Sequence, residues 1–342
     1  MSTSDRSVPL PPRWRWGLSA LVMLLAVAVF AAVDYIRFTQ QSLAINGDDA
    51  IIEIRPGSGF SAIVAQMQSR GWTGRSLWWR VLGMRSGMLS TLKAGEYQMD
   101  VGMRPAQVLE KLSSGQVIQY AFTIVEGWTV KQLVNHLQEA PALTNTLGGQ
   151  VDGLADRLGL DEPLEGWFLP ETYQYPRGTT DLELLLRAHA AMQAALSSAW
   201  EDRAPDLQIK TPYEALVLAS IIERETGVVS ERETISGVFH RRLARNMKLQ
   251  TDPTVIYGMG ERYDGRIRSA DLREDTPYNT YVHRGLPPTP IALPGLAAIV
   301  AACHPESGDS LYFVSKGDGS HQFSATLEEH NRAVDIYIRN RP

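Results

Sequence analysis

The sequence predicts a membrane-anchored α+β protein with two domains after the anchor. Three observations lead to this prediction: a charge-free apolar run near the N-terminus, a β-α-α-β pattern over residues 50–100, and a longer region from residue 119 in which helical patterns alternate with motif-rich loops. With 342 residues, the chain is longer than one compact core usually spans. Its 44% hydrophobic and 21% charged residues are typical of a globular protein.

The apolar run is "WGLSALVMLLAVAVFAAV", residues 16–33, and it is long enough to cross a bilayer. We therefore predict a transmembrane anchor over residues 16–36. Several arginines precede the run and only Arg37 follows it closely, so the positive-inside rule places residues 1–15 in the cytoplasm and the remaining chain outside. A cleaved signal peptide is the alternative, but no small-x-small cleavage site is evident, and "AAVDYIRF" continues the helix.

A polar connector, residues 37–49, leads to a small predicted domain over residues 50–118. In this domain "IIEI" predicts a strand, "RPGSG" a turn, "SAIVAQMQSRG" and "SLWWRVLGMRS" two helices, and "KAGEYQMD" a second strand. This β-α-α-β order and the phrase "PGSGFSAIVAQM" resemble a LysM module, a small fold that binds N-acetylglucosamine polymers. LysM modules have a Gly-Asp-Thr-Leu phrase there, so a purely structural spacer is the alternative.

Residues 119–342 form the second predicted domain, which also mixes strands and helices. It begins with a strand, a glycine turn and an amphipathic helix over residues 120–139. Residues 140–210 are predicted to be helical, interrupted by an ordered loop over residues 164–180 that is rich in Gly, Pro and aromatic residues. A strand, a Gly-rich turn and a terminal amphipathic helix end the chain.

The segment "TPYEALVLASIIERETG", residues 211–227, carries the clearest helix signals in the chain. It predicts a helix over residues 212–226. An N-cap, a proline at the first position, the acidic partner of a capping box and a glycine stop are supplied in turn by Thr211, Pro212, Glu214 and Gly227.

Two glutamates stand at the end of this otherwise apolar helix. With about 3.6 residues per turn, Glu225 shares the apolar stripe of Leu218, Ile221 and Ile222, whereas Glu223 can pair with Arg224 or with a base elsewhere. Burial and the negative end of the helix dipole both raise the pKa of a carboxyl group such as that of Glu225. A raised pKa keeps the group protonated near neutral pH, as a general acid requires. An ordinary helix-end glutamate in a salt bridge is the alternative.

Two later loops, "MKLQTDPTVIYGMGERYDG" and "TPYNTYVHRGLPPTPIALPG", are rich in amide, hydroxyl and tyrosine side chains. Amides and hydroxyls suit sugar hydroxyl and acetamido groups, and tyrosine rings suit sugar faces. We therefore expect substrate-binding residues here: Gln250, Thr251, Asp252, Tyr257, Asn279, Thr280 and Tyr281. Ordered loop packing explains any one of them, but it explains the whole set less well.

The phrases "LASIIERET", "RRLARNMKLQTDPTVIYGMG", "YNTYVHRGLPPTPIALPG" and "LYFVSKGDGSHQF" together closely resemble the endolytic murein transglycosylase family (MltG, YceG-like). The resemblance implies a LysM-like domain joined to a catalytic domain with a lysozyme-like catalytic helix. It also implies a place in the bacterial inner membrane, internal cutting of peptidoglycan strands, and partnership with penicillin-binding synthases and the elongation or division machinery. The family's catalytic residue is the second glutamate of its Glu-x-Glu-Thr phrase, which is Glu225 here.

The reaction that this resemblance implies cleaves the β-1,4 bond between N-acetylmuramic acid and N-acetylglucosamine and leaves a 1,6-anhydro end. One carboxylate suffices because the nucleophile is the muramoyl 6-hydroxyl, whereas a hydrolase usually needs a second carboxylate. Asp252, Glu165 and Glu171 stay open as candidates for that second group. A muramidase-type hydrolase and a non-catalytic membrane-anchored wall-binding scaffold are the two alternative functions.

Composition argues against several other classes of function. The net charge is −5, from 33 basic and 38 acidic residues, which argues against nucleic acid as a partner. The single cysteine, Cys303, cannot form an intrachain disulfide, and we expect it to be a small buried residue. The seven histidines are scattered without metal-ligand spacing, so we expect neither a metal nor another cofactor.

Overall fold

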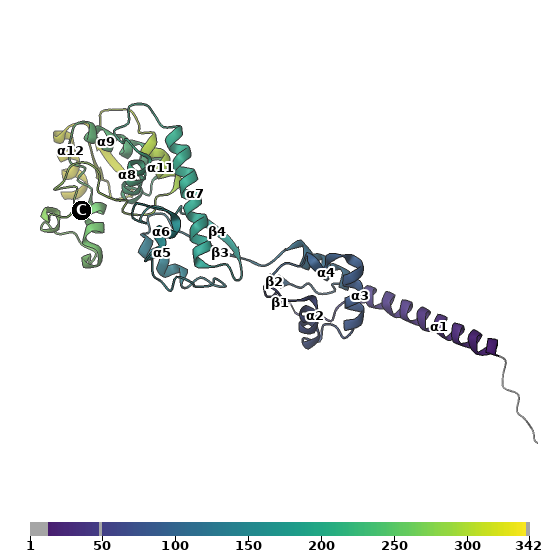
Figure 1. Cartoon of the computed structure of the whole chain (residues 1–342). Helices are drawn as coiled ribbons and strands as arrows, with labels where there is room; N and C mark the ends of the chain where they lie inside the picture. Colours follow the sequence, from purple (N-terminus) through teal and green to yellow (C-terminus); the bar gives the residue numbers. More distant parts are fainter. Residues whose placement is uncertain (1–12, 48–49, 340–342) are drawn as a thin grey trace, which may run out of the picture. The chain divides into compact units, whose positions relative to one another are not determined.

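The computed structural model describes residues 13–47 and 50–339, so most of the predicted cytoplasmic stretch, residues 1–15, lies outside the described residues. The chain divides into two compact units, residues 1–119 and 120–342, which we call unit 1 and unit 2. Both contain helices and strands (Figure 1), as expected for a mixed α+β protein.

Unit 1 begins with the long helix α1 (Arg13–Gln40). Its segment Trp16–Gln40 is long and apolar enough to cross a membrane, and its most apolar stretch is not buried inside the protein. The described helix therefore fits a single-pass anchor. It continues beyond the predicted end at residue 36, and residues of the expected connector enter the core of unit 1, because Phe38, Leu43 and Ile45 are apolar and find packing partners there.

The rest of unit 1 has the β-α-α-β order that the sequence predicts, followed by one more helix. Strands β1 (Ile51–Ile54) and β2 (Gly95–Gln98) pair antiparallel, with Ile51 opposite Gln98 and Ile54 opposite Gly95. Between and after the strands lie α2 (Phe60–Ser69), α3 (Ser76–Ser86), the 3-10 turn η1 (Met88–Ser90) and α4 (Pro105–Ser114). Trp79 and Tyr97 are among the largest fully buried side chains of this unit.

The first part of unit 2 differs from the helical prediction for residues 140–210. A two-stranded sheet joins β3 (Gln119–Thr123) to β4 (Thr172–Pro176), with α5 (Val130–Leu137) and the short α6 (Leu154–Leu158) between them. β4 lies inside the predicted loop, because Tyr173 and Tyr175 alternate with exposed residues and are buried. Pro141, Gly148 and Gly149 do not favour a helix in the segment before α6.

A helical core fills the rest of unit 2. It contains α7 (Asp181–Glu201), α8 (Pro212–Glu225), η2 (Val229–Glu231), α9 (Arg232–Ala244), α10 (Asp252–Met259) and α11 (Leu296–Cys303). Figure 1 shows α8 in the middle of this group. The 3-10 turns η3 (Gly260–Arg262) and η4 (Asp271–Arg273) lie in the loops. The chain ends with an antiparallel hairpin, β5 (Tyr312–Ser315) and β6 (His321–Ser324), and with α12 (Leu327–Val334) and η5 (Asp335–Arg339).

Candidate active site

Helix α8 forms the centre of the unit 2 core and ends at the candidate site. Its residues Ala215 to Ile222 are all buried, and the helix packs against α11, α7 and α9. The Thr211 hydroxyl caps the first turn by accepting a hydrogen bond from the Glu214 N–H at 3.1 Å. The capping box is not completed, because the Glu214 carboxylate accepts from the Lys210 N–H instead. The helix ends at Glu225, since the next residue is extended, and no left-handed glycine cap follows.

Glu225 is the last residue of α8, and protein surrounds most of its carboxylate although the residue still reaches solvent. The buried hydroxyl of Thr251 donates a hydrogen bond to it. Burial raises the pKa of Glu225 to about 7; the Thr251 hydrogen bond opposes this rise, the Asp252 carboxylate adds to it, and the charges of His321 and Arg242 oppose it. With this pKa, both the protonated and the ionised form are populated at neutral pH, which suits a group that first gives and then takes a proton.

The position of the Thr251 hydroxyl is fixed by other buried hydroxyl groups. The Thr251 N–H donates to the Thr280 Oγ1 at 3.0 Å, and the Thr254 hydroxyl donates to the Thr251 carbonyl at 2.8 Å. The hydroxyls of Thr254 and Thr280 lie 2.9 Å apart and share a hydrogen bond. Gln250 makes the turn into this segment with a left-handed backbone, φ 52°, and its N–H donates to the Thr280 carbonyl at 3.2 Å. These bonds hold the loops before α10 and after η4 side by side, with the Thr251 hydroxyl against Glu225.

Asp252 and Tyr281 form a second pair close to Glu225. The Tyr281 hydroxyl donates to the Asp252 Oδ1 at 2.6 Å. Burial raises the pKa of Tyr281, and the charges of Asp252 and Glu225 raise it further, so the phenol stays protonated and acts as a donor. Asp252 and Gln250 are exposed and Tyr281 is half-buried, so a ligand can reach these three side chains.

Asn279, in contrast, is buried and fully engaged in holding its own loop. Its side-chain amide donates to the carbonyls of Asp271 at 3.1 Å and Glu274 at 2.7 Å, and its carbonyl oxygen accepts from the Tyr281 N–H at 2.9 Å. These contacts position Tyr281. A direct contact between Asn279 or the buried Thr280 and a substrate stays a prediction.

Glu165 is another buried carboxyl group in unit 2. Its two oxygens accept hydrogen bonds from the Val130 N–H at 3.0 Å and the Tyr257 hydroxyl at 3.2 Å. Burial raises the pKa of Glu165 to about 7, although the hydrogen bonds from Val130 and Tyr257 oppose the rise. The hydroxyl of Tyr257, predicted to contact substrate, is therefore directed at Glu165. Glu171 is exposed just before β4, and its carbonyl pairs with the Ile124 N–H.

Three further residues influence the surroundings of Glu225, and the sequence did not single them out: Glu231, Arg242 and His321. Glu231 accepts hydrogen bonds from the His321 ring at 2.8 Å, from the His321 N–H at 2.9 Å and from the Thr226 hydroxyl at 3.4 Å. Burial raises the pKa of Glu231, but the hydrogen bonds from His321 outweigh it and leave the pKa below its usual value. An ionised Glu231 holds the proton of His321 on Nδ1 and leaves Nε2 for other partners.

Arg242 is the third of these residues. It is buried, and it donates to the carbonyls of Leu311 at 2.6 Å and Leu249 at 2.7 Å. Its positive charge therefore lies inside the protein, where it lowers the pKa of Glu225. Arg242 and His321 stand in quoted motifs, but their distance in sequence from Glu225 gives no signal that they are neighbours.

Glu223, the other glutamate at the end of α8, has a structural role. Its buried carboxylate forms an ion pair with Arg232 at 2.9 Å and accepts the Gly295 N–H at 2.9 Å. Arg232 also lies 3.3 Å from Glu126, and the neighbouring Arg224 donates to the Gly127 carbonyl at 3.2 Å. These contacts fix the last turn of α8 and hence the position of Glu225.

Other chemistry has little support in the residues that the structure describes. In that part of the chain, no group of three or more His, Cys, Asp and Glu side chains is placed to hold a metal ion. Cys303 is fully buried, as expected, and burial raises the pKa of its thiol to about 11. A thiol in that state is protonated and shielded from substrates.

Residues 52–336 match the YceG-like family, and this match covers both units. The chain belongs to the YceG-like family. It is 33% identical over 272 residues to the endolytic murein transglycosylase of Bacillus subtilis, covering 74% of this chain and 75% of that protein. It is 28% identical over 292 residues to the endolytic murein transglycosylase of Streptococcus pneumoniae, covering 73% of this chain and 51% of that protein.

A solved structure agrees with this family membership. The crystal structure of a YceG-like protein from Listeria monocytogenes matches 83% of this chain and 98% of its own, with a TM-score of 0.52 and 28% identity. Membership of the YceG-like family therefore rests on the sequence and on the arrangement of the chain in space.

Proposed function

We propose that this protein is a membrane-anchored endolytic transglycosylase that cuts peptidoglycan glycan strands internally. The observation that carries the proposal is Glu225, a carboxyl group with a pKa of about 7 at the accessible end of a buried helix. Support also comes from the YceG-like family match and from relatives named endolytic murein transglycosylases.

In the first chemical step, protonated Glu225 donates its proton to the oxygen of the β-1,4 bond between N-acetylmuramic acid and N-acetylglucosamine. Burial makes the acid form available, since it raises the pKa to about 7. The bond to the leaving N-acetylglucosamine then breaks, and positive charge develops at the anomeric carbon. Ionised Glu225 is left beside this charge and keeps its hydrogen bond from Thr251.

In the second step, ionised Glu225 takes the proton of the muramoyl 6-hydroxyl while that oxygen attacks the anomeric carbon. A 1,6-anhydro ring closes, the carboxyl group regains its proton, and no water is consumed. An internal nucleophile replaces the second carboxylate that a hydrolase uses. Among the earlier candidates for that group, Glu165 has both oxygens engaged with Val130 and Tyr257, which favours a structural role.

The accessible residues of the site are proposed to bind the glycan. Gln250, Asp252 and Tyr281 offer an amide, a carboxylate and a phenol that a ligand can reach. Tyr257 is half-buried and offers an aromatic edge beside Tyr278, with ring centroids 4.9 Å apart. Thr251, Asn279 and Thr280 are buried, and we propose that they position the other groups instead of gripping the sugar.

The remaining proposals concern placement in the cell. We propose that α1 anchors the chain in the bacterial inner membrane with its N-terminus in the cytoplasm, and that unit 2 works in the periplasm. The β-α-α-β part of unit 1 is proposed to be a LysM-like module, either binding glycan or acting as a spacer. Penicillin-binding synthases and the elongation or division machinery are the proposed protein partners.

The test uses the full chain in detergent micelles with uncrosslinked peptidoglycan strands, and mass spectrometry of the products. The proposal expects internal cuts with anhydro ends from the wild type, none from Glu225→Gln, and retained cutting by the control Glu165→Gln. Cutting by Glu225→Gln would contradict the assignment of the general acid. A folded wild type that cuts nothing would favour the scaffold function.

A further inference from the structure

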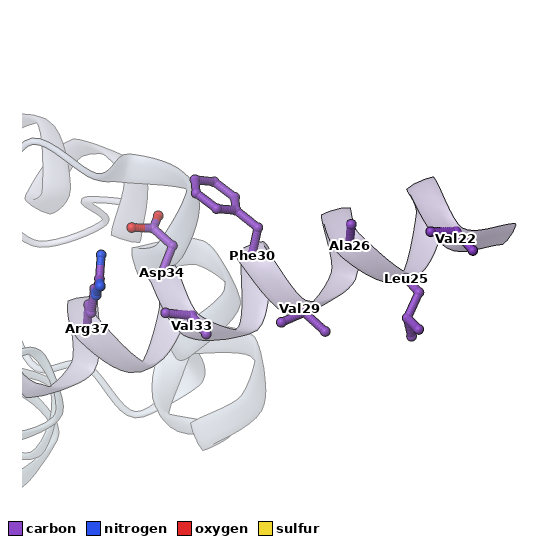
Figure 2. A pocket seen from close by; sticks show the side chains of 8 residues that line it. All are labelled: Val22, Leu25, Ala26, Val29, Phe30, Val33, Asp34 and Arg37. Carbon is purple, nitrogen blue, oxygen red and sulfur yellow. The ribbon is translucent and has the colours of Figure 1, made fainter. Parts of the chain in front are cut away.

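The apolar span of α1 and the fold of unit 1 are parts of one continuous helix. Figure 2 shows the apolar side chains along one face of α1, from Val22 to Val33, followed directly by Asp34 and Arg37. The helix then continues to Gln40, and Phe38 is buried in the core of unit 1. The anchor is therefore built into unit 1, without a flexible connector between them.

Helix α3 is fixed to α1 at the residue where the apolar span ends. The Asp34 carboxylate accepts hydrogen bonds from Arg75 at 2.9 Å and from the Trp78 indole at 2.7 Å. The Tyr35 ring lies 5.4 Å from that of Trp78, and the Arg85 guanidinium lies 5.6 Å from the Tyr35 ring. Tryptophan and tyrosine gather at membrane–water interfaces, and the long side chain of arginine can reach the headgroups there.

The free face of α3 combines apolar and basic side chains. Leu77 and Met84 are 64% and 67% exposed, and Arg80 and Arg85 are exposed beside them. Positions 77, 80 and 84 lie on one side of a helix, opposite the buried Trp79. Figure 1 shows α3 on the side of unit 1 from which α1 leaves. Exposed apolar residues flanked by arginines are typical of helices that lie in a membrane interface.

We propose that α3 lies in the headgroup region of the membrane that α1 crosses, so that unit 1 is seated directly on the bilayer. This proposal rests on the proposed anchor. Asp34 follows the apolar span by about 1.5 Å along the helix axis, so the groups bound to it lie next to the hydrocarbon boundary. Leu77 and Met84 enter the interface, while Arg80 and Arg85 reach lipid phosphates. The seating fixes the height of unit 1 above the membrane.

The test places a fluorescent probe at single positions of the full chain reconstituted in phosphatidylcholine–phosphatidylglycerol vesicles. Cysteine is introduced by Leu77→Cys or Met84→Cys in a Cys303→Ala background and labelled with a polarity-sensitive dye. Spin-labelled lipids then quench the dye according to its depth. The matched control is Val101→Cys. Val101 is also 67% exposed, but it follows β2 and lies near Met103, which pairs with Leu43 beyond the C-terminal end of α1. The anchor control is Leu25→Cys.

We expect the labels at positions 77 and 84 to lose about half of their emission to lipids spin-labelled near the headgroup, and the label at position 101 to lose little. The label at position 25 is quenched best by lipids labelled deep in the chains. Labels at 77 and 84 that behave like the label at 101, while the label at 25 is quenched, would overturn the seating of α3 alone. Lack of quenching at position 25 would overturn the anchor itself.

Discussion

Replacing Thr251 with Val removes the hydroxyl that hydrogen-bonds Glu225 and almost preserves the side-chain volume. That hydrogen bond favours the ionised carboxylate, so its loss raises the pKa of Glu225 further. A hydrogen bond to a charged group contributes about 1.5–3 kcal/mol. The protonated carboxyl keeps part of it, so we take about 1.4 kcal/mol as the difference between the two forms, which equals about one pKa unit. The pKa of Glu225 is then about 7 in the wild type and about 8 in the variant.

The assay is kcat/KM for strand cutting between about pH 5 and 9. The free enzyme must hold the proton that it donates, so activity falls as the pH rises through the pKa of Glu225. We expect this fall near pH 7 in the wild type, and about one unit higher in Thr251→Val. The control is Thr254→Val, which removes the bonds of the Thr254 hydroxyl to the Thr251 carbonyl at 2.8 Å and to the Thr280 hydroxyl at 2.9 Å but keeps the Thr251 hydroxyl that hydrogen-bonds Glu225. An unshifted profile in Thr251→Val, or a wild-type fall near pH 4.5, would refute the reasoning.

Three further predictions concern stability. Because the pKa of Glu225 is raised from 4.5 to about 7, the wild type loses stability as the pH rises from about 4.5 to 7. Glu225→Gln does not ionise, so above pH 7 its free energy of unfolding, measured with urea, should exceed that of the wild type by up to about 3 kcal/mol. Below pH 4.5 the two should be equally stable. Arg232→Met removes the ion-pair partner of the buried Glu223 carboxylate and should lower the free energy of unfolding near pH 8 by about 3–5 kcal/mol. The double variant Glu223→Gln/Arg232→Met should recover much of this stability, and equal stability of the single and double variants would contradict the prediction. Asn279→Ala removes three hydrogen bonds and should lower stability by roughly 3 kcal/mol and weaken substrate binding through Tyr281, whereas an unchanged melting temperature and KM would count against the positioning role.

Local signals in the sequence predicted much of the fold. The β-α-α-β order of unit 1 follows from turn residues and alternating apolar patterns, which act over a few residues. The prediction failed for residues 140–153 and for β4, where a short strand pairs with a distant partner. Pairing between β3 and β4 depends on residues about fifty positions apart, which a local pattern does not register. The packing of residues in the predicted connector, residues 37–49, was missed for a related reason, because the core that buries Phe38 is built from later residues.

The candidate site was predictable where one helix carries it. The apolar stripe of α8 predicts that Glu225 lies on a buried face, and in the structure burial raises its pKa to about 7. The roles of the neighbours were not predictable in the same way. Whether Asn279 faces a ligand or its own backbone depends on the folded loop, and His321 reaches the site only through the hairpin of β5 and β6.

The central claim is that Glu225 alone carries both proton transfers, with a nucleophile supplied by the substrate. The measurement that tests it most directly is strand cutting by the full chain in water enriched with oxygen-18, followed by mass spectrometry of the new ends. The claim predicts 1,6-anhydro ends without oxygen-18, and loss of these ends in Glu225→Gln. Reducing ends that carry oxygen-18 would contradict it, because water would then be the nucleophile and a second carboxylate would be needed to activate it.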